Sequence, residues 1–168
     1  MSAASRSDSM RGGGRATGGP TTESDRSATP VVDTGTAFGA RVAGRLEREN
    51  VIWLTTVGRS GTPQPNPVWF QWRDGEFLIF SQADKPKLRN IARNSRVSLH
   101  LNSTASGGDV VILTGTARID EAGATPAEVA AFTEKYAEGL ASLSMTEEQF
   151  HADYSVTVRI TPDRLRGF

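Results

Sequence analysis

Apolar and polar side chains alternate with a period of two along much of the chain, and this pattern constrains the fold more than any other feature. In RVSLHLN (96–102), Val97, Leu99 and Leu101 fall on one face and the intervening residues on the other. Such alternation is typical of a β-strand that buries one face. The same pattern, or a run of β-branched and aromatic residues, predicts strands at 51–57, 67–73, 76–81, 110–119 and 155–161. Asp74-Gly75 separates two of them, which predicts a tight hairpin.

Three stretches have a helical pattern instead. Phe38, Val42 and Leu46 recur at four-residue spacing, and a short helix is predicted at about 86–94. The segment before the last strand contains capping boxes that begin at Thr125 and Thr146. No regular alternation of strand and helix occurs, so a doubly wound nucleotide-binding fold is not expected. We expect a mainly β protein: six or more antiparallel strands curled into a barrel, with helices packed on the outside.

The chain of 168 residues is long enough for one ordinary domain with one core. Residues 1–33 are rich in Gly, Ser, Thr and Arg and contain no aromatic side chain. We therefore predict a disordered tail at 1–33 and a folded domain at 34–168. A transit peptide and an over-extended start are alternatives for the tail, although its acidic residues disfavour the first.

Composition excludes several classes of chemistry. The absence of cysteine removes disulfides, thiolate metal sites and thiol catalysis, and His100 and His151 are too few for a recognisable zinc site. Nineteen basic residues balance nineteen acidic ones, which gives no reason to expect nucleic acid or an anionic membrane as a partner. No apolar run approaches the ~20 residues needed to span a bilayer, and no signal-peptide pattern is present. We expect a cytoplasmic protein.

A local run of cations interrupts this balance. Between residues 85 and 96 there are five basic residues and no carboxylate: Lys85, Lys87, Arg89, Arg93 and Arg96. Lys85 and Lys87 flank Pro86 at the expected start of a helix, where free N–H groups and the helix dipole already favour an anion. A merely solvated helix usually interleaves charges of both signs. The run favours a phosphate-binding site, with a solvated basic face as the alternative.

Three alternating prolines, Pro63, Pro65 and Pro67, precede the aromatic strand at 67–73. Each proline removes a donor from the strand ladder, so this strand is predicted to lie at a sheet edge or to be broken at its start. Such an edge can contact a ligand, or it can simply resist aggregation. The sequence supports both interpretations equally.

Aromatic residues follow these prolines. In a regular strand Trp69 and Gln71 share one face and Trp72 falls on the other, so Trp69 and Gln71 would suit a planar heterocycle or a subunit interface. Trp53 lies in a continuous apolar strand and is expected in the core. No Ser-His-Asp arrangement, carboxylate pair or metal-ligand spacing can be recognised. The catalytic residues therefore stay unassigned, and any chemistry is expected to come from a cofactor.

At these motifs the chain resembles a known family. The similarity lies in GTPQPNPVWFQWRDGEFLIFSQADKPKLRNIARNSRVSLHLN (61–102) and the closing VRITPDRL. Both resemble the split β-barrel of the pyridoxamine-phosphate-oxidase-like superfamily, and within it the actinobacterial oxidoreductases that use the deazaflavin coenzyme F420. The resemblance covers roughly residues 38–168. It implies a split β-barrel that forms a homodimer, with two cofactor sites in grooves between the subunits.

The resemblance also implies which residues bind the cofactor. Lys85 and Lys87 would hold its phosphate, and the polyglutamate tail could extend toward Arg93 and Arg96. The full set of implied cofactor-binding residues is Gln64, Asn66, Val68, Trp69, Ser81, Lys85, Lys87, Arg89 and Asn90. The implied reaction is hydride transfer between the deazaflavin C5 and a small acceptor, such as an activated double bond, a quinone or a bilin. FMN is the alternative cofactor because it also presents a phosphate, and a non-catalytic module that binds a flavin or a tetrapyrrole is a third alternative.

Overall fold

The computed structural model describes residues 30–168. The tail expected at 1–33 therefore lies outside the described residues, apart from its last positions. Among these, Val32 is 8% exposed and belongs to the hydrophobic core, and Val31 packs against that core. The core thus begins slightly before the expected boundary at residue 34, because these apolar side chains are buried.

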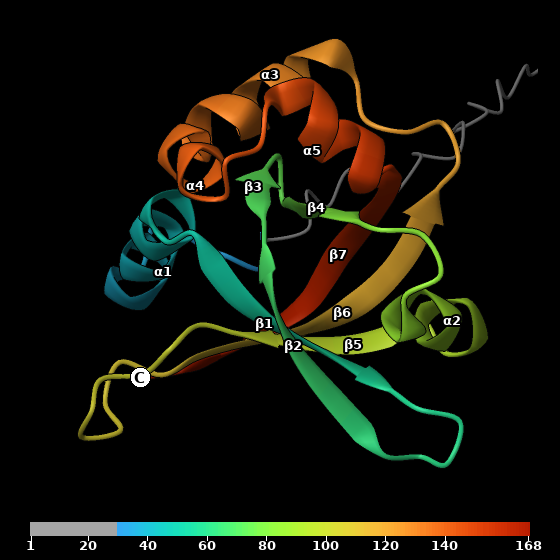
Figure 1. The fold of residues 1–168 in the computed structure, drawn as a ribbon. Coiled ribbons are helices and arrows are strands. Elements are labelled where there is room, and N and C mark those ends of the chain that lie inside the picture. The colour runs from blue at the N-terminus through green and yellow to red at the C-terminus, as the bar shows by residue number, and fades with distance from the viewer. Residues whose placement is uncertain (1–29) are drawn as a thin grey trace, which may run out of the picture.

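Seven strands and five helices make up the described part of the chain (Figure 1). The strands are β1 (Val51–Val57), β2 (Pro63–Trp69), β3 (Gln71–Arg73), β4 (Glu76–Ser81), β5 (Arg96–His100), β6 (Val111–Asp120) and β7 (Val156–Gly167). The helices are α1 (Ala37–Arg48), α2 (Pro86–Arg93), α3 (Pro126–Lys135), α4 (Ala137–Ser142) and α5 (Glu147–Asp153). Both capping boxes are present, at the starts of α3 and α5. Within residues 30–168, no helix combines the length and the apolar character needed to cross a membrane.

All seven strands form one antiparallel sheet in the order β2-β1-β5-β6-β7-β4-β3. Figure 1 shows this sheet curled into a half-barrel, with α3, α4 and α5 gathered over one side and α2 beside another. The expected mainly β fold with flanking helices is confirmed. The strands that end the sheet, β2 and β3, follow each other directly in the sequence, so the chain itself joins the two edges.

The prediction of a single strand at 67–73 is wrong, because this stretch is divided at Phe70 into β2 and β3. At this position the chain leaves one edge of the sheet and enters the other, so the Phe70 backbone has no strand partner. The Tyr136 hydroxyl accepts a hydrogen bond from the Phe70 N–H (2.8 Å) and lies 2.7 Å from its carbonyl oxygen. Lys135 Nζ donates to the same carbonyl oxygen at 3.0 Å. The end of α3 thus satisfies the backbone at the break, as a buried polar group requires.

Two hydrophobic clusters hold the domain together. The larger one fills the concave face of the sheet and includes the apolar faces of α1 and α2, with Val42, Leu46, Leu88 and Ile91 among its members. The smaller one joins α3, α4 and α5 through Phe132, Tyr136, Leu140 and Phe150, and Trp69 and Phe80 from the sheet pack against it. The α3–α5 segment therefore rests on the ends of β2 and β4.

Trp53 does not lie in the core, contrary to the expectation from its apolar neighbours. In β1 the buried residues are Ile52, Leu54 and Thr56, so Trp53 points to the opposite face of the sheet. There its ring stacks on His100, with 6.0 Å between ring centroids, and its Nε1 donates to Asn102 Oδ1 at 2.9 Å. The apolar run suggested that Trp53 lies in the core. The strand in fact alternates between two faces, and Trp53 is an aromatic residue on the second face.

Candidate functional site

β2 lies at one end of the sheet and pairs only with β1. This confirms the edge position predicted from the prolines, although the proline-rich stretch is itself part of the strand. Because Pro63, Pro65 and Pro67 have no N–H, the ladder bonds to β1 must use the residues between them. Successive residues of an antiparallel strand direct their backbone groups to opposite sides. The free edge from 63 to 67 therefore offers carbonyl oxygens without N–H donors.

Two adjacent grooves run beside β2, and Lys85 and Lys87 line both of them. The first, of about 450 Å³, is lined by Pro63, Gln64, Pro65, Asn66, Lys85, Pro86 and Lys87. The second, of about 390 Å³, is lined by Pro67, Val68, Trp69, Phe80, Gln82, Lys85, Lys87, Leu143, Phe150 and Tyr154. The structure thus brings six of the expected cofactor-binding residues to one continuous region: Gln64, Asn66, Val68, Trp69, Lys85 and Lys87.

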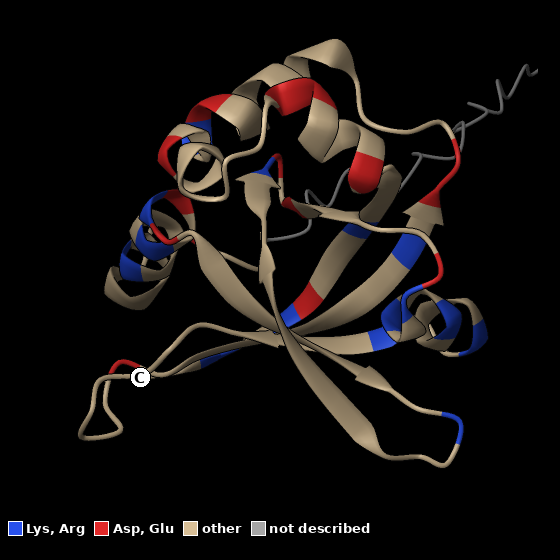
Figure 2. Cartoon of the chain, in the orientation of Figure 1, with Lys and Arg blue, Asp and Glu red and all other residues tan. Residues whose placement is uncertain are grey.

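Positive charge at this region is uncompensated. Lys85 is the N-cap residue of α2, no side chain caps the helix, and its first turn contains no acid. Burial, together with the neighbouring charge of Lys85, lowers the pKa of Lys87. Among residues 30–168, no carboxylate oxygen lies within 4.0 Å of either lysine, including that of the adjacent Asp84. Figure 2 shows basic positions along α2, as well as on α1 and elsewhere in the chain. An anion bound here would relieve the repulsion and meet the helix dipole.

Three other expected residues do not line these grooves. Ser81 is fully buried, and its hydroxyl donates to the Gln82 carbonyl oxygen at 3.0 Å. Arg89 folds back so that its Nη1 donates to the Asp84 carbonyl oxygen at 2.5 Å. Asn90 is 6% exposed and faces the sheet rather than the grooves.

The Asn90 side chain holds α2 against the barrel. Its Nδ2 donates to Thr56 Oγ1 at 3.0 Å and to Gln64 Oε1 at 2.9 Å. Its Oδ1 accepts a hydrogen bond from Arg93 Nη2 at 3.1 Å, and the same nitrogen donates to the Val57 carbonyl oxygen. All hydrogen-bonding capacity of the amide except one acceptor lone pair is thus used within the protein. Asn90 therefore positions the lysines by fixing the helix that carries them.

The second groove has an apolar wall that the sequence reasoning missed. This wall consists of Trp69, Phe80, Leu143, Phe150 and Tyr154. Phe150 lies in α5, and Tyr154 directly follows its last residue. The two are four residues apart, a spacing that places them on one face and predicts a buried helical stripe. Nothing in that spacing distinguishes a core face from the wall of a groove. The helical segment 137–154 therefore contributes to the site from far away in the sequence.

The Trp69 ring is already engaged within the chain. It stacks on Tyr136 with 4.5 Å between centroids and an interplanar angle of 7°, and it lies 5.7 Å from the ring of Phe150. Gln71, which was expected to share its face, belongs to β3 and lines a different pocket. The division of the strand at Phe70 separates these two side chains. Trp69 thus borders the groove as part of a stack of aromatic rings.

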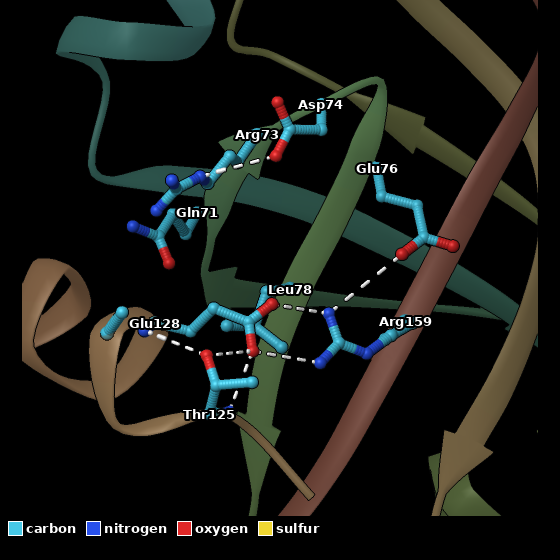
Figure 3. Close-up of a pocket in the computed structure, with 9 residues that line it drawn as sticks. Gln71, Arg73, Asp74, Glu76, Leu78, Thr125, Glu128 and Arg159 are labelled. Carbon is cyan, nitrogen blue, oxygen red and sulfur yellow. Dashed lines mark hydrogen bonds and ion pairs between the residues drawn. The ribbon is translucent and has the colours of Figure 1, made fainter.

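A second charged pocket, of about 290 Å³, lies between α3 and the β3–β4 hairpin (Figure 3). At its base Arg159 Nη1 and Nη2 donate to the two carboxylate oxygens of Glu128, at 2.7 and 3.0 Å. Arg159 Nε also donates to Asp120 Oδ2 at 2.5 Å, and Arg159 Nη1 lies 3.9 Å from Glu76 Oε2. These hydrogen bonds to Arg159 lower the pKa of Glu128 to about 2.

This pocket connects α3 to β7 through charges that are paired with one another. The Arg159 side chain is 13% exposed and that of Glu128 is 18% exposed, so both charges are largely removed from water. A group of His, Cys, Asp or Glu side chains suited to a metal ion is not found in residues 30–168. The pairing gives the Arg159 pocket a structural role, and it leaves the grooves beside β2 as the candidate functional site.

Solved structures with a similar fold bind or act on different compounds. An F420 reductase is 23% identical, with a TM-score of 0.55, and the alignment covers 73% of this chain and 94% of that one. The heme storage protein HutZ from Vibrio cholerae is 15% identical, with a TM-score of 0.57 and coverage of 76% and 92%. A conserved hypothetical protein from Mycobacterium tuberculosis is 24% identical, with a TM-score of 0.59 and coverage of 76% and 81%. These similarities show the fold alone.

The comparison with protein families is more specific. A search among curated proteins gives no match. The family model described as pyridoxamine 5'-phosphate oxidase matches residues 38–167, which include every strand and every helix except the first residue of α1. The protein belongs to the pyridoxamine 5'-phosphate oxidase family.

Proposed function

We propose that this protein is an F420-dependent oxidoreductase that transfers a hydride between the deazaflavin C5 and a small organic acceptor. The observation that carries the proposal is the position of Lys85 and Lys87, which line both grooves beside an edge strand and have no carboxylate partner among the described residues. An unpaired pair of cations at an uncapped helix N-terminus fits a phosphate, and the adjoining grooves fit a flat ring system. The F420 reductase with the same fold is consistent with this assignment.

The residues present can be matched to parts of such a cofactor. Lys85, Lys87 and the N-terminus of α2 would hold the phosphate. Asn66 and Val68 would lie beside the ring, and the proline carbonyl oxygens of β2 could accept a hydrogen bond from a ring N–H. When bound, the deazaflavin supplies hydride chemistry that the side chains cannot. The protein would contribute orientation, which can be worth ~7–11 kcal/mol in favourable systems.

The other expected residues would act indirectly. Asn90 fixes α2 through Thr56 and Gln64, and Ser81 ends the buried strand next to the loop that carries the lysines. Arg89 would remain at the rim, where it braces the Asp84 carbonyl oxygen. No side chain in the grooves stands out as a proton donor, so water is proposed for that role.

A homodimer is part of the proposal. The face of the sheet opposite the core carries Trp53, His100 and Ile112 in neighbouring register across β1, β5 and β6, and each of them is half-buried within the single chain. A second copy against this face would lie next to the free edge of β2 and would help to close the grooves. Size-exclusion chromatography with light scattering should give twice the mass of the chain. A monomer at micromolar concentration would contradict this part of the proposal.

The cofactor is tested by direct binding. Purified protein is titrated with oxidised F420, FMN and riboflavin, and ligand fluorescence is followed. We expect F420 to bind at least about tenfold more tightly than riboflavin, since riboflavin lacks the phosphate. Equal affinities for F420 and riboflavin would contradict the proposal, and a clear preference for FMN would support the alternative cofactor. Oxidation of reduced F420 by an added acceptor, followed by absorbance, then distinguishes an enzyme from a binding module.

A further inference from the structure

The second groove has an apolar wall in addition to its two lysines. We infer that it binds a planar, uncharged and apolar acceptor, and that Leu143 and Tyr154 select which acceptors enter. This inference rests on the proposed function for its chemistry, but the binding surface can be tested without the cofactor.

Two lysines and an apolar wall both line this groove. Apart from Gln82 and the two lysines, its lining is made of proline, valine, leucine and aromatic side chains. An ionised acceptor placed against that wall would lose hydration without gaining a partner, which is strongly unfavourable. An anionic acceptor would instead be drawn to Lys85 and Lys87, where it would compete with the phosphate. The two parts of the groove thus suit two different ligands.

The aromatic rings of the wall form a near-parallel stack. Trp69 lies on Tyr136 with an interplanar angle of 7°, and Phe150 is inclined to Trp69 by 26°. Phe150 in turn stacks on Tyr154 at 4.5 Å and 13°. Phe150 is almost fully buried, whereas Tyr154 is half-buried. A flat conjugated ligand would extend this stack with the offset geometry that aromatic pairs prefer.

Leu143 adds an exposed apolar side chain at the same place. It is 51% exposed, and among the described residues only Ile119 and Phe168 are the other large apolar side chains of this kind. It follows the last residue of α4 and precedes Ser144, whose φ of 54° marks a tight turn. Covering Leu143 with an apolar ligand would remove that surface from water. Isolated exposed leucines are common. The exposure of Leu143 indicates a binding surface because it lies at a groove with an apolar wall.

The implied reaction balances without a further reagent. A quinone acceptor takes one hydride from C5 of the reduced cofactor and one proton from solvent, and becomes the hydroquinone. The cofactor releases its own ring proton to solvent and becomes the oxidised deazaflavin. A quinone therefore serves as a probe of the acceptor class.

The test compares a neutral and a charged probe of the same shape. Menadione and naphthoquinone sulfonate are titrated by calorimetry into the protein, both free and loaded with F420. The variants are Leu143→Ser and Tyr154→Ala, and Ile119→Ser is the matched control because Ile119 is exposed but lies outside the groove. Circular dichroism confirms that each variant is folded.

With F420 loaded, so that its phosphate occupies the lysines, we expect menadione to bind at least about tenfold more tightly than the sulfonate, and each groove variant to weaken menadione by about five- to tenfold. Ile119→Ser should change neither menadione binding nor F420 affinity. Equal binding of the two probes, or unchanged menadione binding in both groove variants, would overturn the inference. Menadione binding that depends on Leu143 in a protein that fails to bind F420 would support the apolar site and reject the proposed function instead.

Discussion

The grooves beside α2 and the pocket around Arg159 both contain cations that are partly removed from water, but only the second supplies carboxylates to meet them. Arg159 has Glu128 and Asp120 within hydrogen-bonding distance. Lys87 has no carboxylate within 4.0 Å among residues 30–168, and burial and the charge of Lys85 lower its pKa. The two regions are thus opposite in their charge balance.

This difference distinguishes charges that stabilise the fold from charges that are available to bind a ligand. A buried charge whose ion-pair and hydrogen-bond partners all belong to the same chain is stabilised by those partners, and it requires no bound ligand. The half-buried Lys87 beside the exposed Lys85 raises the energy of the free protein, and a bound anion would lower it again. The Arg159 pocket thus stabilises the fold, whereas the lysines of α2 are candidate ligand-binding groups.

The largest expected effect is on stability. Arg159→Met removes the cation, leaves Glu128 without an ion-pair partner and leaves Asp120 with only the exposed Arg118, so the free energy of unfolding should fall by roughly 3 kcal/mol. Urea denaturation measures this change. Affinity for F420 should be unaffected, because Arg159 lines neither groove.

Arg118→Met is the matched control for this prediction. The Arg118 side chain also faces Glu76 and Asp120, but it is 54% exposed. Exposed ion pairs contribute at most about 1 kcal/mol, and often nothing measurable. If Arg118→Met and Arg159→Met cost the same, the Arg159 pocket is not the structural clamp described above.

The next largest effect is on binding. Replacing both Lys85 and Lys87 with glutamine should weaken F420 binding by about 10- to 100-fold, since hydrogen bonds to charged groups contribute roughly 1.5–3 kcal/mol. Stability should be unchanged or slightly higher, because the repulsion between the lysines is lost. A fluorescence titration and a urea curve on the same variant measure both.

Two results would remove the contrast between the regions. Unchanged F420 affinity in the double variant would mean that the basic run is only a solvated face. A large loss of stability would mean that the lysines have partners after all. Arg89→Gln is the control, because Arg89 belongs to the same basic run but does not line either groove.

The two regions also differ in how far the sequence could predict them. The lysines, the prolines and the start of α2 lie within 25 residues of one another, so local chemistry was enough to predict an edge strand beside a pair of lysines. The Arg159 pocket joins α3, the β3–β4 hairpin and the last strand. Its residues come together only when the barrel closes, and no local pattern in the sequence marks them.

The break at Phe70 and the apolar wall were missed for the same reason. The alternation of apolar residues continues across Phe70, so the strand pattern shows no interruption. The groups that satisfy the Phe70 backbone, Tyr136 and Lys135, lie about 65 residues away. Leu143 and Tyr154 reach the groove from an equally distant segment. Short-range sequence patterns predict individual strands and helices well, but they do not predict which of these elements pack together.

An intermediate effect is expected where the two edges of the sheet join. Tyr136→Phe removes a hydroxyl that accepts from the Phe70 N–H and lies within 2.9 Å of the Asn50 carbonyl oxygen. The loss of a buried neutral hydrogen-bonding group should cost about 1–2 kcal/mol, less than the loss of the Arg159 charge. Phe132→Leu is a useful comparison, because it alters packing in the same cluster without removing a hydrogen bond. A cost for Tyr136→Phe equal to or above that of Arg159→Met would reverse the expected order.

The smallest effect is the dependence of stability on pH. The folded-state pKa of Glu128, at about 2, lies below its ordinary value of 4.5. The unfolded chain therefore binds more protons between these values, so the stabilisation from this group is complete above about pH 4.5 and is lost as the pH falls toward 2.

Lys87 should produce a dependence of the same sign in a different range. Its pKa is lowered in the folded protein, so the unfolded chain again binds more protons, and stability should rise with pH as Lys87 loses its proton below 10.5. Bound phosphate should oppose that loss, and F420 affinity should therefore fall in the same alkaline range. Urea curves across pH should lose the acid slope in Arg159→Met. In Lys87→Gln the alkaline rise should become smaller but not vanish, because burial also lowers the pKa of Lys135, to about 8. An alkaline rise of unchanged size in Lys87→Gln would assign all of it to other groups and would contradict the lowered pKa of Lys87.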